Sequence, residues 1–223
     1  MKILIIGASG MVGQAVLKEC LEHSAVEEVT TLSRAPLNLE HAKLKAIILE
    51  DFQQFNTLSE DWSRLDACFY CMGISSVGVD TAVYQKITVD ITVTIADELY
   101  QKQPNMVFTY VSGQGTDSSE KGRVQWARIK GKAENYILSR GFKDAYMFRP
   151  GVILPQKGIR SRTAWYNAVY MLMRPFFPLL LRSKNISTTT TLGLAMIRCV
   201  QRPLENKHLE NAQINALAAE VEV

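Results

Sequence analysis

Short apolar runs alternate along most of the chain with stretches in which apolar residues recur at helical spacing. The first run, residues 3–6, is too short and too rich in β-branched side chains for a buried helix, so it predicts a strand of a parallel sheet. Comparable runs predict strands at 29–32, 46–49, 67–72, 107–111 and 146–149, and a last short strand around Ile214. Helical spacing predicts helices at 12–21, 124–140 and 190–200, and a helical turn at 58–65.

The stretch 84–99 fits two patterns. Alternation typical of a strand is shown by Ile87, Val89, Ile91, Val93 and Ile95. One face of a helix is formed by Tyr84, Ile87, Ile91, Ile95 and Leu99. We predict a helix, because two neighbouring parallel strands need a crossover connection between them.

The alternation of strands and helices predicts an α/β fold, a Rossmann-like doubly wound parallel sheet with right-handed crossovers and helices on both faces. We expect one domain over residues 1–223, in which 153–187 form a small substrate-side insertion in the C-terminal part. Ligands of such sheets bind beyond the carboxyl ends of the strands. The residues expected to converge there are Gly7, Arg34, Asp51, Gly73, Ser112 and Arg149.

A glycine-rich turn, Gly7-Ala8-Ser9-Gly10-Met11-Val12-Gly13, directly follows the first strand and directly opens the first helix. Gly7 permits a sharp turn, Gly10 lets the backbone approach a pyrophosphate, and Gly13 lets the helix pack against its strand. The free N–H groups and the positive dipole end of the helix suit a dinucleotide pyrophosphate. The alternative is an ordinary strand-to-helix turn that is rich in glycine.

The second strand ends in Ser33-Arg34, where NAD-binding folds usually place an acid that holds the adenosine ribose. That acid is missing, and Glu27 and Glu28 lie at the wrong end of the strand. A guanidinium at this position can bind a 2′-phosphate through paired, charge-assisted hydrogen bonds, which favours NADP. The alternative is that Arg34 is a solvated loop cation.

Composition narrows the class of protein. A chain of 223 residues with 47% hydrophobic content can build one domain with a full core. The formal net charge is only +3, so we do not expect the whole molecule to bind nucleic acid. The N-terminal apolar run ends at a glycine turn and lacks a cleavage site, so it does not resemble a signal peptide. We therefore predict a cytoplasmic protein.

Four cysteines are scattered along the chain, which favours reduced thiols in a chain without secretory features. Cys68 and Cys71 have the spacing of a redox or metal motif, but they lie in a strand-like run where residues three apart point to opposite faces. We interpret them as structural residues. The three histidines are isolated in the sequence, so we predict no metal site.

Several motifs together resemble a known family. These are the glycine turn at 7–13, Ser33-Arg34, Ser112, Lys130-Gly131 followed by an acidic helix, and Arg149-Pro150-Gly151-Val152. The chain resembles the atypical short-chain dehydrogenases/reductases of the branch related to the Tat-interacting protein, which are often labelled NAD-dependent epimerases. The resemblance covers most of the chain, and the Lys-Gly and Arg-Pro-Gly motifs are its more specific part.

The resemblance implies a set of site residues. Ser112 would orient the substrate, and Lys130 would bond the nicotinamide ribose. Cofactor-binding residues would be Gly7, Ala8, Ser9, Gly10, Met11, Val12, Gly13, Ser33, Arg34, Asp51, Phe52, Cys71, Met72, Gly73, Lys130, Pro150, Gly151 and Val152. The alternatives are that Ser112 caps a turn and that Lys130 is a solvated helix residue.

One departure concerns the chemistry. The family mechanism uses a Tyr four residues before the Lys, and this chain has Trp126 there. A phenol can exchange a proton with a carbonyl or hydroxyl, whereas an indole N–H can only donate a hydrogen bond. Tyr70, Tyr84, Tyr110 and Tyr136 lack the required spacing. Trp126 can also be a packing residue.

The sequence therefore favours an NADP(H)-binding protein descended from reductases, an oxidoreductase or epimerase of unknown substrate. The first alternative is a non-catalytic, NADP(H)-sensing interaction protein, in which loss of the Tyr reflects lost chemistry. A further alternative is an active reductase that uses water or a displaced Tyr as its acid.

Charge is unevenly distributed along the chain. No acidic residue lies between Asp144 and Glu205, whereas 157–202 contain eight cations: Lys157, Arg160, Arg162, Arg174, Arg182, Lys184, Arg198 and Arg202. The aromatic residues Trp165, Tyr166 and Tyr170 lie in the same segment, and the apolar run 171–181 is too short and broken to span a bilayer. The segment is either a packed subdomain with solvated cations or a basic lid that recruits an anionic small-molecule substrate, an acidic partner or an anionic membrane surface.

Overall fold

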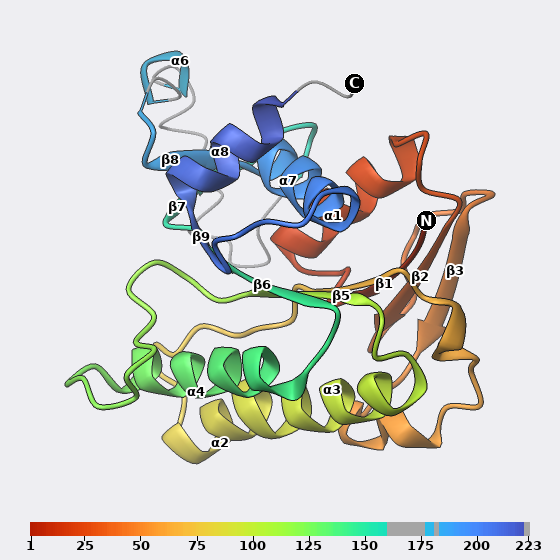
Figure 1. Cartoon of the computed structure of the whole chain (residues 1–223), viewed down its shortest axis with the longest axis horizontal. Coiled ribbons are helices and arrows are strands. Elements are labelled where there is room, and N and C mark those ends of the chain that lie inside the picture. Colours follow the sequence, from red (N-terminus) through yellow and green to blue (C-terminus); the bar gives the residue numbers. More distant parts are fainter. Residues whose placement is uncertain (160–176, 181–182, 221–223) are drawn as a thin grey trace.

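The computed structural model describes residues 1–159, 177–180 and 183–220, except for the side chains of 178 and 179. Within these residues a seven-stranded parallel sheet lies between two layers of helices (Figure 1). The strand order is β3-β2-β1-β4-β5-β6-β9, the doubly wound arrangement that the sequence predicts. The strands are β1 Lys2–Ile6, β2 Glu28–Ser33, β3 Leu44–Ile48, β4 Ala67–Tyr70, β5 Val107–Val111, β6 Asp144–Arg149 and β9 His208–Glu210.

Two helical layers cover the sheet. Helices α1 (Met11–Glu22), α7 (Thr189–Gln201) and α8 (Asn211–Ala219) lie above it in Figure 1. Below it lie α2 (Thr81–Gln85), α3 (Ile91–Lys102) and α4 (Gln125–Arg140). The side chains of residues 3–6 are wholly buried between these layers, which confirms that this apolar run is an inner parallel strand.

The ambiguous stretch around residues 84–99 is helical. Helix α2 continues through a π-helical segment, Lys86–Asp90, into α3, so the three segments form one helical stretch. A π-helical turn holds more residues than an α-helical turn, which shifts the buried face. That shift explains why the apolar positions also follow a strand-like alternation.

Cys68 and Cys71 fall on opposite faces of the sheet, as their spacing predicts. Cys68 packs with residues of α3 and α4, and Cys71 packs with residues of α1 and α7. All four cysteines are free, and burial raises the pKa of each thiol. They are structural residues rather than reactive ones.

The prediction of a strand around Ile214 is wrong. Ile214 lies in α8, and the last strand is β9, a few residues earlier. The side chain of Glu210 and that of Gln213 cap each other's backbone N–H groups, and this capping box begins a helix. Ile214 and Leu217, three residues apart, then form its buried face.

Other local features were not predicted. The expected helical turn at 58–65 is replaced by two 3₁₀ segments, Phe52–Thr57 and Trp62–Arg64. A second, two-stranded parallel sheet pairs β7 (Val152–Leu154) with β8 (Ile186–Thr188). The short helix α6 spans Phe177–Leu180. The predicted insertion at 153–187 lies in part outside the described residues, so it remains a prediction.

Candidate dinucleotide site

The glycine turn after β1 has the geometry that a phosphate-binding turn needs. Gly7 has a φ of +88°, and a Cβ there would lie 2.8 Å from the backbone nitrogen of Met72. A Cβ on Gly13 would lie 2.2 Å from the carbonyl oxygen of Gly7, so only glycine lets α1 pack this closely. Around Gly10, only the Gly7 carbonyl comes near the Cβ position, at 3.5 Å. The start of α1 is therefore open to a ligand.

A cleft of about 230 Å³ opens beside this turn. It brings together ten of the predicted cofactor residues: Gly7, Ser9, Gly10, Ser33, Arg34, Asp51, Phe52, Cys71, Met72 and Gly73. They come from the carboxyl ends of β1, β2, β3 and β4, where a doubly wound sheet binds its ligand. Gly10 is the N-cap of α1 and provides no side-chain cap, so first-turn N–H groups can bind phosphate oxygens. These residues fit a dinucleotide.

Arg34 is the exposed cation on the rim of this cleft. No carboxylate among the described residues forms an ion pair with it, so its guanidinium can accept an anionic ligand. The neighbouring hydroxyl of Ser33 donates to the carbonyl of Ala35 at 2.7 Å and thereby holds the turn that presents Arg34. A cationic side chain thus stands where NAD-binding folds usually have an acid.

The third strand contributes the opposite wall. The carboxylate of Asp51 accepts a hydrogen bond from the Gln53 backbone N–H at 2.9 Å and caps the 3₁₀ segment that follows. Phe52 is buried beside it. Four further lining residues were not predicted: Glu50, Ile74, Ile87 and Ile91. Ile87 and Ile91 reach the cleft from the π-helical segment and the start of α3, and single-sequence periodicity does not reveal such a turn.

Lys130 lies next to the cleft without lining it. Its ammonium donates a hydrogen bond to the backbone carbonyl of Ser112 at 3.0 Å and lies 5.9 Å from the ring centre of Tyr110. The position of a Cβ on Gly73, a residue of the cleft, is 4.0 Å from the same nitrogen. Burial lowers the pKa of Lys130 to about 8, against the opposing attraction of Glu134. Lys130 is therefore a packed, partly desolvated residue rather than a solvated one.

Ser112 faces a buried ionic cluster. Its hydroxyl donates to the Glu134 carboxylate at 2.5 Å, and Arg149 donates to the same carboxylate through Nε at 3.0 Å. The Glu134 side chain is 0% exposed and that of Arg149 13% exposed. The expected convergence of Arg149 on the ligand cleft is therefore incorrect, because its guanidinium turns inward to neutralise a buried charge.

Glu134 was missed by the sequence reading. It stands four residues after Lys130 and shares that face of α4. The sequence does contain a signal for it, because an acidic residue within the apolar face of a helix is unusual. Glu134 fixes the hydroxyl of Ser112 by accepting its hydrogen bond. Because Ser112 is held in this way, its backbone carbonyl is also held in place as the acceptor for Lys130.

Trp126 packs over the loop that follows β5. Its Cη2 lies 3.7 Å from the Cβ position of Gly115, whose φ of +85° leaves the backbone open to the ring. The ammonium of Lys130 lies over the ring of Tyr110. That tyrosine is buried, and burial raises the pKa of its phenol. Among the described residues, no phenol occupies the place that Trp126 takes.

The remaining predicted residues lie outside the 230 Å³ cleft. Gly151 donates its backbone N–H to the Asn211 side chain at 2.8 Å, and Val152 is 52% exposed in β7. Pro150 is buried at the end of β6, Ala8 is buried beneath the glycine turn, and Met11 and Val12 lie in the first turn of α1. None of these residues lines the cleft.

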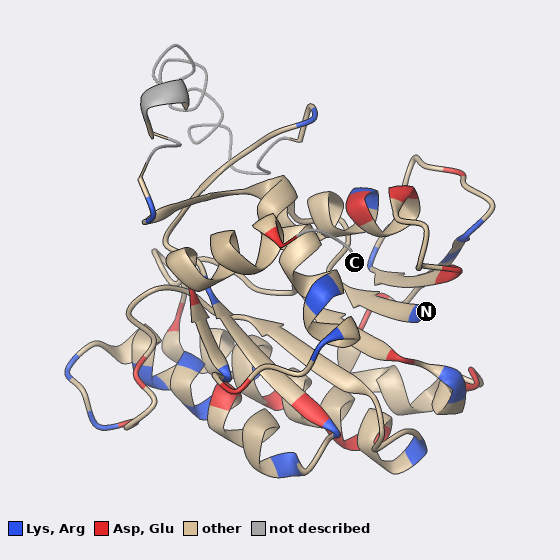
Figure 2. Ribbon diagram, turned by 45° about the horizontal axis from the view of Figure 1, so that its top comes forward, with Lys and Arg blue, Asp and Glu red and all other residues tan. Residues whose placement is uncertain are grey.

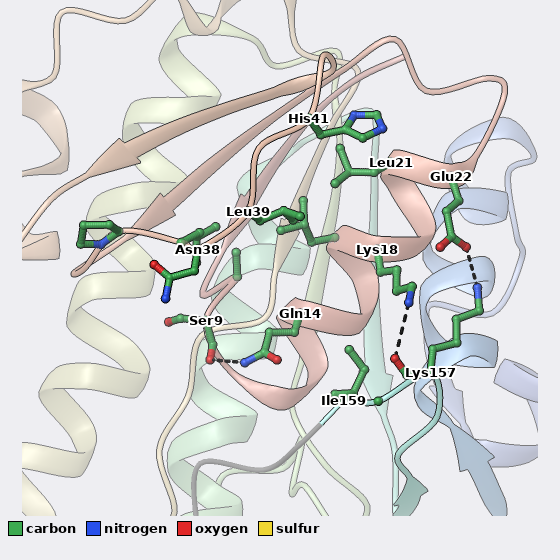
Figure 3. Close-up of a pocket in the computed structure, with 15 residues that line it drawn as sticks. Ser9, Gln14, Lys18, Leu21, Glu22, Asn38, Leu39, His41, Lys157 and Ile159 are labelled. Atoms are coloured by element: carbon green, nitrogen blue, oxygen red, sulfur yellow. Dashed lines mark hydrogen bonds and ion pairs between the residues drawn. The ribbon is translucent and has the colours of Figure 1, made fainter.

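A second and larger cleft of about 850 Å³ lies on the outer side of α1 (Figure 3). It shares Ser9 with the dinucleotide cleft. Its other walls are the loop between β2 and β3 and the turn at 157–159. No group of three or more His, Cys, Asp or Glu residues in the described part of the chain could hold a metal ion.

Charged residues do not form a single basic surface. In the described part of the chain, Lys and Arg are scattered among Asp and Glu over both helical layers (Figure 2). No helix of that part is long and apolar enough to cross a membrane. Four arginines of the basic segment, Arg160, Arg162, Arg174 and Arg182, lie outside the described residues, as do Trp165, Tyr166 and Tyr170.

The parallel sheet, the glycine turn and the cleft at the strand ends define a nucleotide-binding Rossmann protein of the short-chain dehydrogenase type. The model of the NAD dependent epimerase/dehydratase family matches residues 3–123, more than half of the chain. The chain belongs to this family.

Relatives agree with this placement. Protein HTATIP2 from Rattus norvegicus is 27% identical over 154 residues, which cover 68% of this chain and 62% of the rat protein. The chain therefore matches less than two thirds of that relative. The protein fmp52 from Emericella nidulans, named as mitochondrial, is 26% identical over 165 residues, covering 70% of this chain and 68% of the fungal protein.

Solved structures share the fold. Gre2 from Candida albicans in complex with NADPH matches with a TM-score of 0.68 and 14% identity, covering 94% of this chain and 77% of Gre2. The Bordetella bronchiseptica enzyme WbmH in complex with NAD+ matches with a TM-score of 0.66 and 14% identity, covering 94% and 75%. Gre2 and WbmH thus hold nicotinamide dinucleotides on a fold of this type, NADPH in the first and NAD+ in the second.

The cytoplasmic location predicted from the sequence is corrected by these relatives. The FMP52 proteins of Emericella nidulans, Eremothecium gossypii and Candida albicans are named as mitochondrial. An N-terminal apolar run that does not resemble a signal peptide does not identify a compartment.

Proposed function

We propose that this protein binds NADP(H) in the cleft beside the glycine turn and belongs to the reductase type. The observation that carries the proposal concerns Arg34, which lines the same cleft as Gly7 and Gly10. Its guanidinium is exposed and forms no ion pair with a carboxylate among the described residues. First-turn N–H groups of α1 would hold the pyrophosphate, and Arg34 would hold the 2′-phosphate. Asp51, Phe52 and the segment Cys71-Met72-Gly73 would enclose the adenosine.

The nicotinamide, when bound, would supply or accept a hydride. Lys130 would hold the nicotinamide ribose, because the Ser112 carbonyl fixes its ammonium close to Gly73, a residue of the cleft. Trp126 would cover the loop at Gly115 and close that side of the substrate space without moving a proton. The substrate is proposed to be a small molecule that an oxidoreductase or epimerase can act on.

Titration calorimetry with NADPH and NADH tests the proposal. We expect NADPH to bind more tightly, and Arg34→Ala to weaken NADPH binding by about ten-fold or more while NADH binding stays the same, since a charge-assisted hydrogen bond is lost. The matched control is Arg64→Ala, an exposed arginine that precedes β4 and lies at the amino end of that strand, away from the cleft at the carboxyl ends. Equal affinity for both cofactors in the wild type, unchanged by Arg34→Ala, would refute NADP(H) preference.

A second candidate function is NADP(H) sensing without catalysis. Two observations favour it. The acid/base position holds Trp126, and the hydroxyl of Ser112 donates its hydrogen bond to Glu134. In that case the bound cofactor sets the shape of a surface that a partner protein binds. Tight NADPH binding combined with no turnover on any carbonyl substrate supports this candidate.

The basic segment 157–202 is proposed to contact an anion, either an anionic small-molecule substrate or, through peripheral binding, an acidic partner or anionic membrane surface. Exposed charges are screened beyond about 8 Å at physiological ionic strength, so such contact must weaken with salt. Binding of anionic vesicles or phosphorylated small molecules across a salt series tests this, with Arg160→Glu/Arg162→Glu as the variant.

A further inference from the structure

The larger cleft on α1 exists because the chain omits a helix. Residues 34–43, which connect β2 to β3, contain no helix, although a helix usually covers the sheet at this crossover. The loop instead stands away from α1, and a cleft of about 850 Å³ remains between them. Clefts of roughly 300–1,000 Å³ are typical of small-molecule sites.

The walls of this cleft are apolar along one side. Leu21 on α1 lies across from Leu39 on the loop (Figure 3), and Leu17 and Leu37 line the same cleft. Leu39 is 44% exposed, so part of its apolar surface is accessible to a ligand in the cleft. From Gln14 to Glu22 the cleft follows α1 over about 12 Å, since a helix rises about 1.5 Å per residue. Its shape suits an elongated apolar group.

The two lysines of the cleft are balanced by two carboxylates, Glu22 in its lining and the buried Glu19 directly behind it. The lining includes Lys18, Lys157 and Glu22. The ammonium of Lys157 pairs with Glu22 at 2.7 Å and with the buried Glu19 at 2.8 Å, so its charge is satisfied. Lys18 donates a long hydrogen bond of 3.5 Å to the Lys157 carbonyl and forms no ion pair among the described residues, although its charge helps to lower the pKa of Glu22. Its ammonium can therefore pair with an anionic ligand.

We propose that this cleft binds an amphipathic monoanion, a medium-chain carboxylate whose apolar tail lies between α1 and Leu37–Leu39 and whose carboxylate pairs with Lys18. The tail removes apolar surface of Leu21 and Leu39 from water, which drives binding. The ammonium supplies the one charge-assisted contact that fixes orientation. The ligand is distinct from the dinucleotide and goes beyond the proposed NADP(H) function.

The two clefts meet at Ser9. The side-chain amide of Gln14, which lines the larger cleft, donates to the Ser9 carbonyl at 2.9 Å (Figure 3). A ligand in the larger cleft therefore contacts a residue that positions the phosphate turn. Its occupancy and NADPH binding are expected to be linked, and any such coupling is reciprocal.

Fluorescence titration with dansylaminoundecanoic acid tests the proposal, because the emission of the dansyl group rises in an apolar site. We expect saturable binding at one site per chain. Lys18→Met and Leu39→Asp should each weaken binding about ten-fold or more, the first because a charge-assisted contact is lost and the second because a charge is placed against the apolar tail. The matched controls are Lys132→Met on the exposed face of α4 and Val83→Asp, where Val83 is 48% exposed on α2.

Two further arms separate the alternatives. The methyl ester of the probe, which has no charge, should bind at least ten-fold more weakly than the acid. Anionic vesicles carrying the same net charge should not compete with the soluble probe. Absence of probe binding, equal binding of the ester, or displacement by NADPH that Lys18→Met and Leu39→Asp leave unchanged would each overturn the proposal. Binding to vesicles alone would assign the positive charge to a membrane surface instead and would also overturn it.

Discussion

The hydroxyl of Ser112 and the carboxylate of Glu134 meet 2.5 Å apart in the interior, where Glu134 is wholly shielded from water. Arg149 completes the cluster from the end of β6. The contact joins the carboxyl end of β5 to helix α4, and Lys130 on the same helix returns a hydrogen bond to the Ser112 backbone. One side of the candidate site is therefore held in place by the buried carboxylate of Glu134, which does not line the cleft.

Replacing Glu134 by Gln should destabilise the fold markedly. The variant keeps an acceptor for Ser112 but leaves the buried guanidinium of Arg149 without its counter-charge, and breaking one partner of a buried pair typically costs about 3–5 kcal/mol. Urea denaturation followed by circular dichroism measures the loss. The control is Glu220→Gln, because the Arg202–Glu220 pair is exposed and such pairs contribute about 0–1 kcal/mol. Equal effects of the two changes would contradict a buried ionic role for Glu134.

Lys130 should make stability depend on pH in a defined window. Its pKa is about 8 in the folded protein and 10.5 in the unfolded chain, so between these values the unfolded chain binds more protons. The free energy of unfolding contributed by Lys130 must then rise as pH increases from 8 to 10.5, and its unfavourable effect is complete below pH 8. Denaturation of the wild type and of Lys130→Met across this range isolates the effect, since other titrating groups are common to both. If the difference in unfolding free energy between the wild type and Lys130→Met does not change with pH, the Lys130 pKa is not lowered.

The fold could be predicted because its main strands are buried on both faces and therefore appear as uninterrupted apolar runs. Residues 3–6 illustrate this, as does the glycine turn that ends the run. The strand expected at Ile214 failed for a physical reason: a short apolar stretch does not distinguish strand from helix, and the capping by Glu210 decided for a helix. The pair β7–β8 could not be foreseen, since two three-residue strands carry no detectable period.

Substitution of Gly131 by Ala should destabilise the protein although the position is helical and Ala is the better helix former. A Cβ on Gly131 would lie 1.8 Å from the backbone carbonyl oxygen of Asp117, so α4 or the loop before it must move. We expect a loss of about 1–3 kcal/mol, the usual effect of overpacking. Thermal or urea unfolding provides the measurement, and Lys132→Ala on the exposed face of the same helix is the control. A stabilising effect of Gly131→Ala would show that this contact relaxes freely.

The candidate site was predictable where backbone geometry dictates the residue and less so where packing does. The glycine turn, Arg34 and the strand-end residues were found from their position after a strand. Ile87, Ile91 and Glu134 were not, because a π-helical turn and a buried ion pair arise from contacts between distant segments. Ser112 was assigned a role toward the substrate, but its hydroxyl is bonded to Glu134, a partner that sequence spacing alone does not reveal.

The final prediction concerns proton transfer at position 126. With Trp126 in place we expect NADPH-dependent reduction of simple aldehydes to be absent or very slow, because the indole cannot act as an acid at this position. A positioned general acid contributes about 10²- to 10⁴-fold in rate, so Trp126→Tyr should raise turnover by up to that factor, the new phenol standing one helical turn before Lys130. Consumption of NADPH followed by absorbance, with Trp126→Phe as the control for loss of the indole ring, separates a proton-transfer effect from a change in packing at Gly115. If the wild type reduces aldehydes at ordinary enzyme rates with a pH profile that Trp126→Phe leaves unchanged, another group moves the proton and position 126 is a packing residue only.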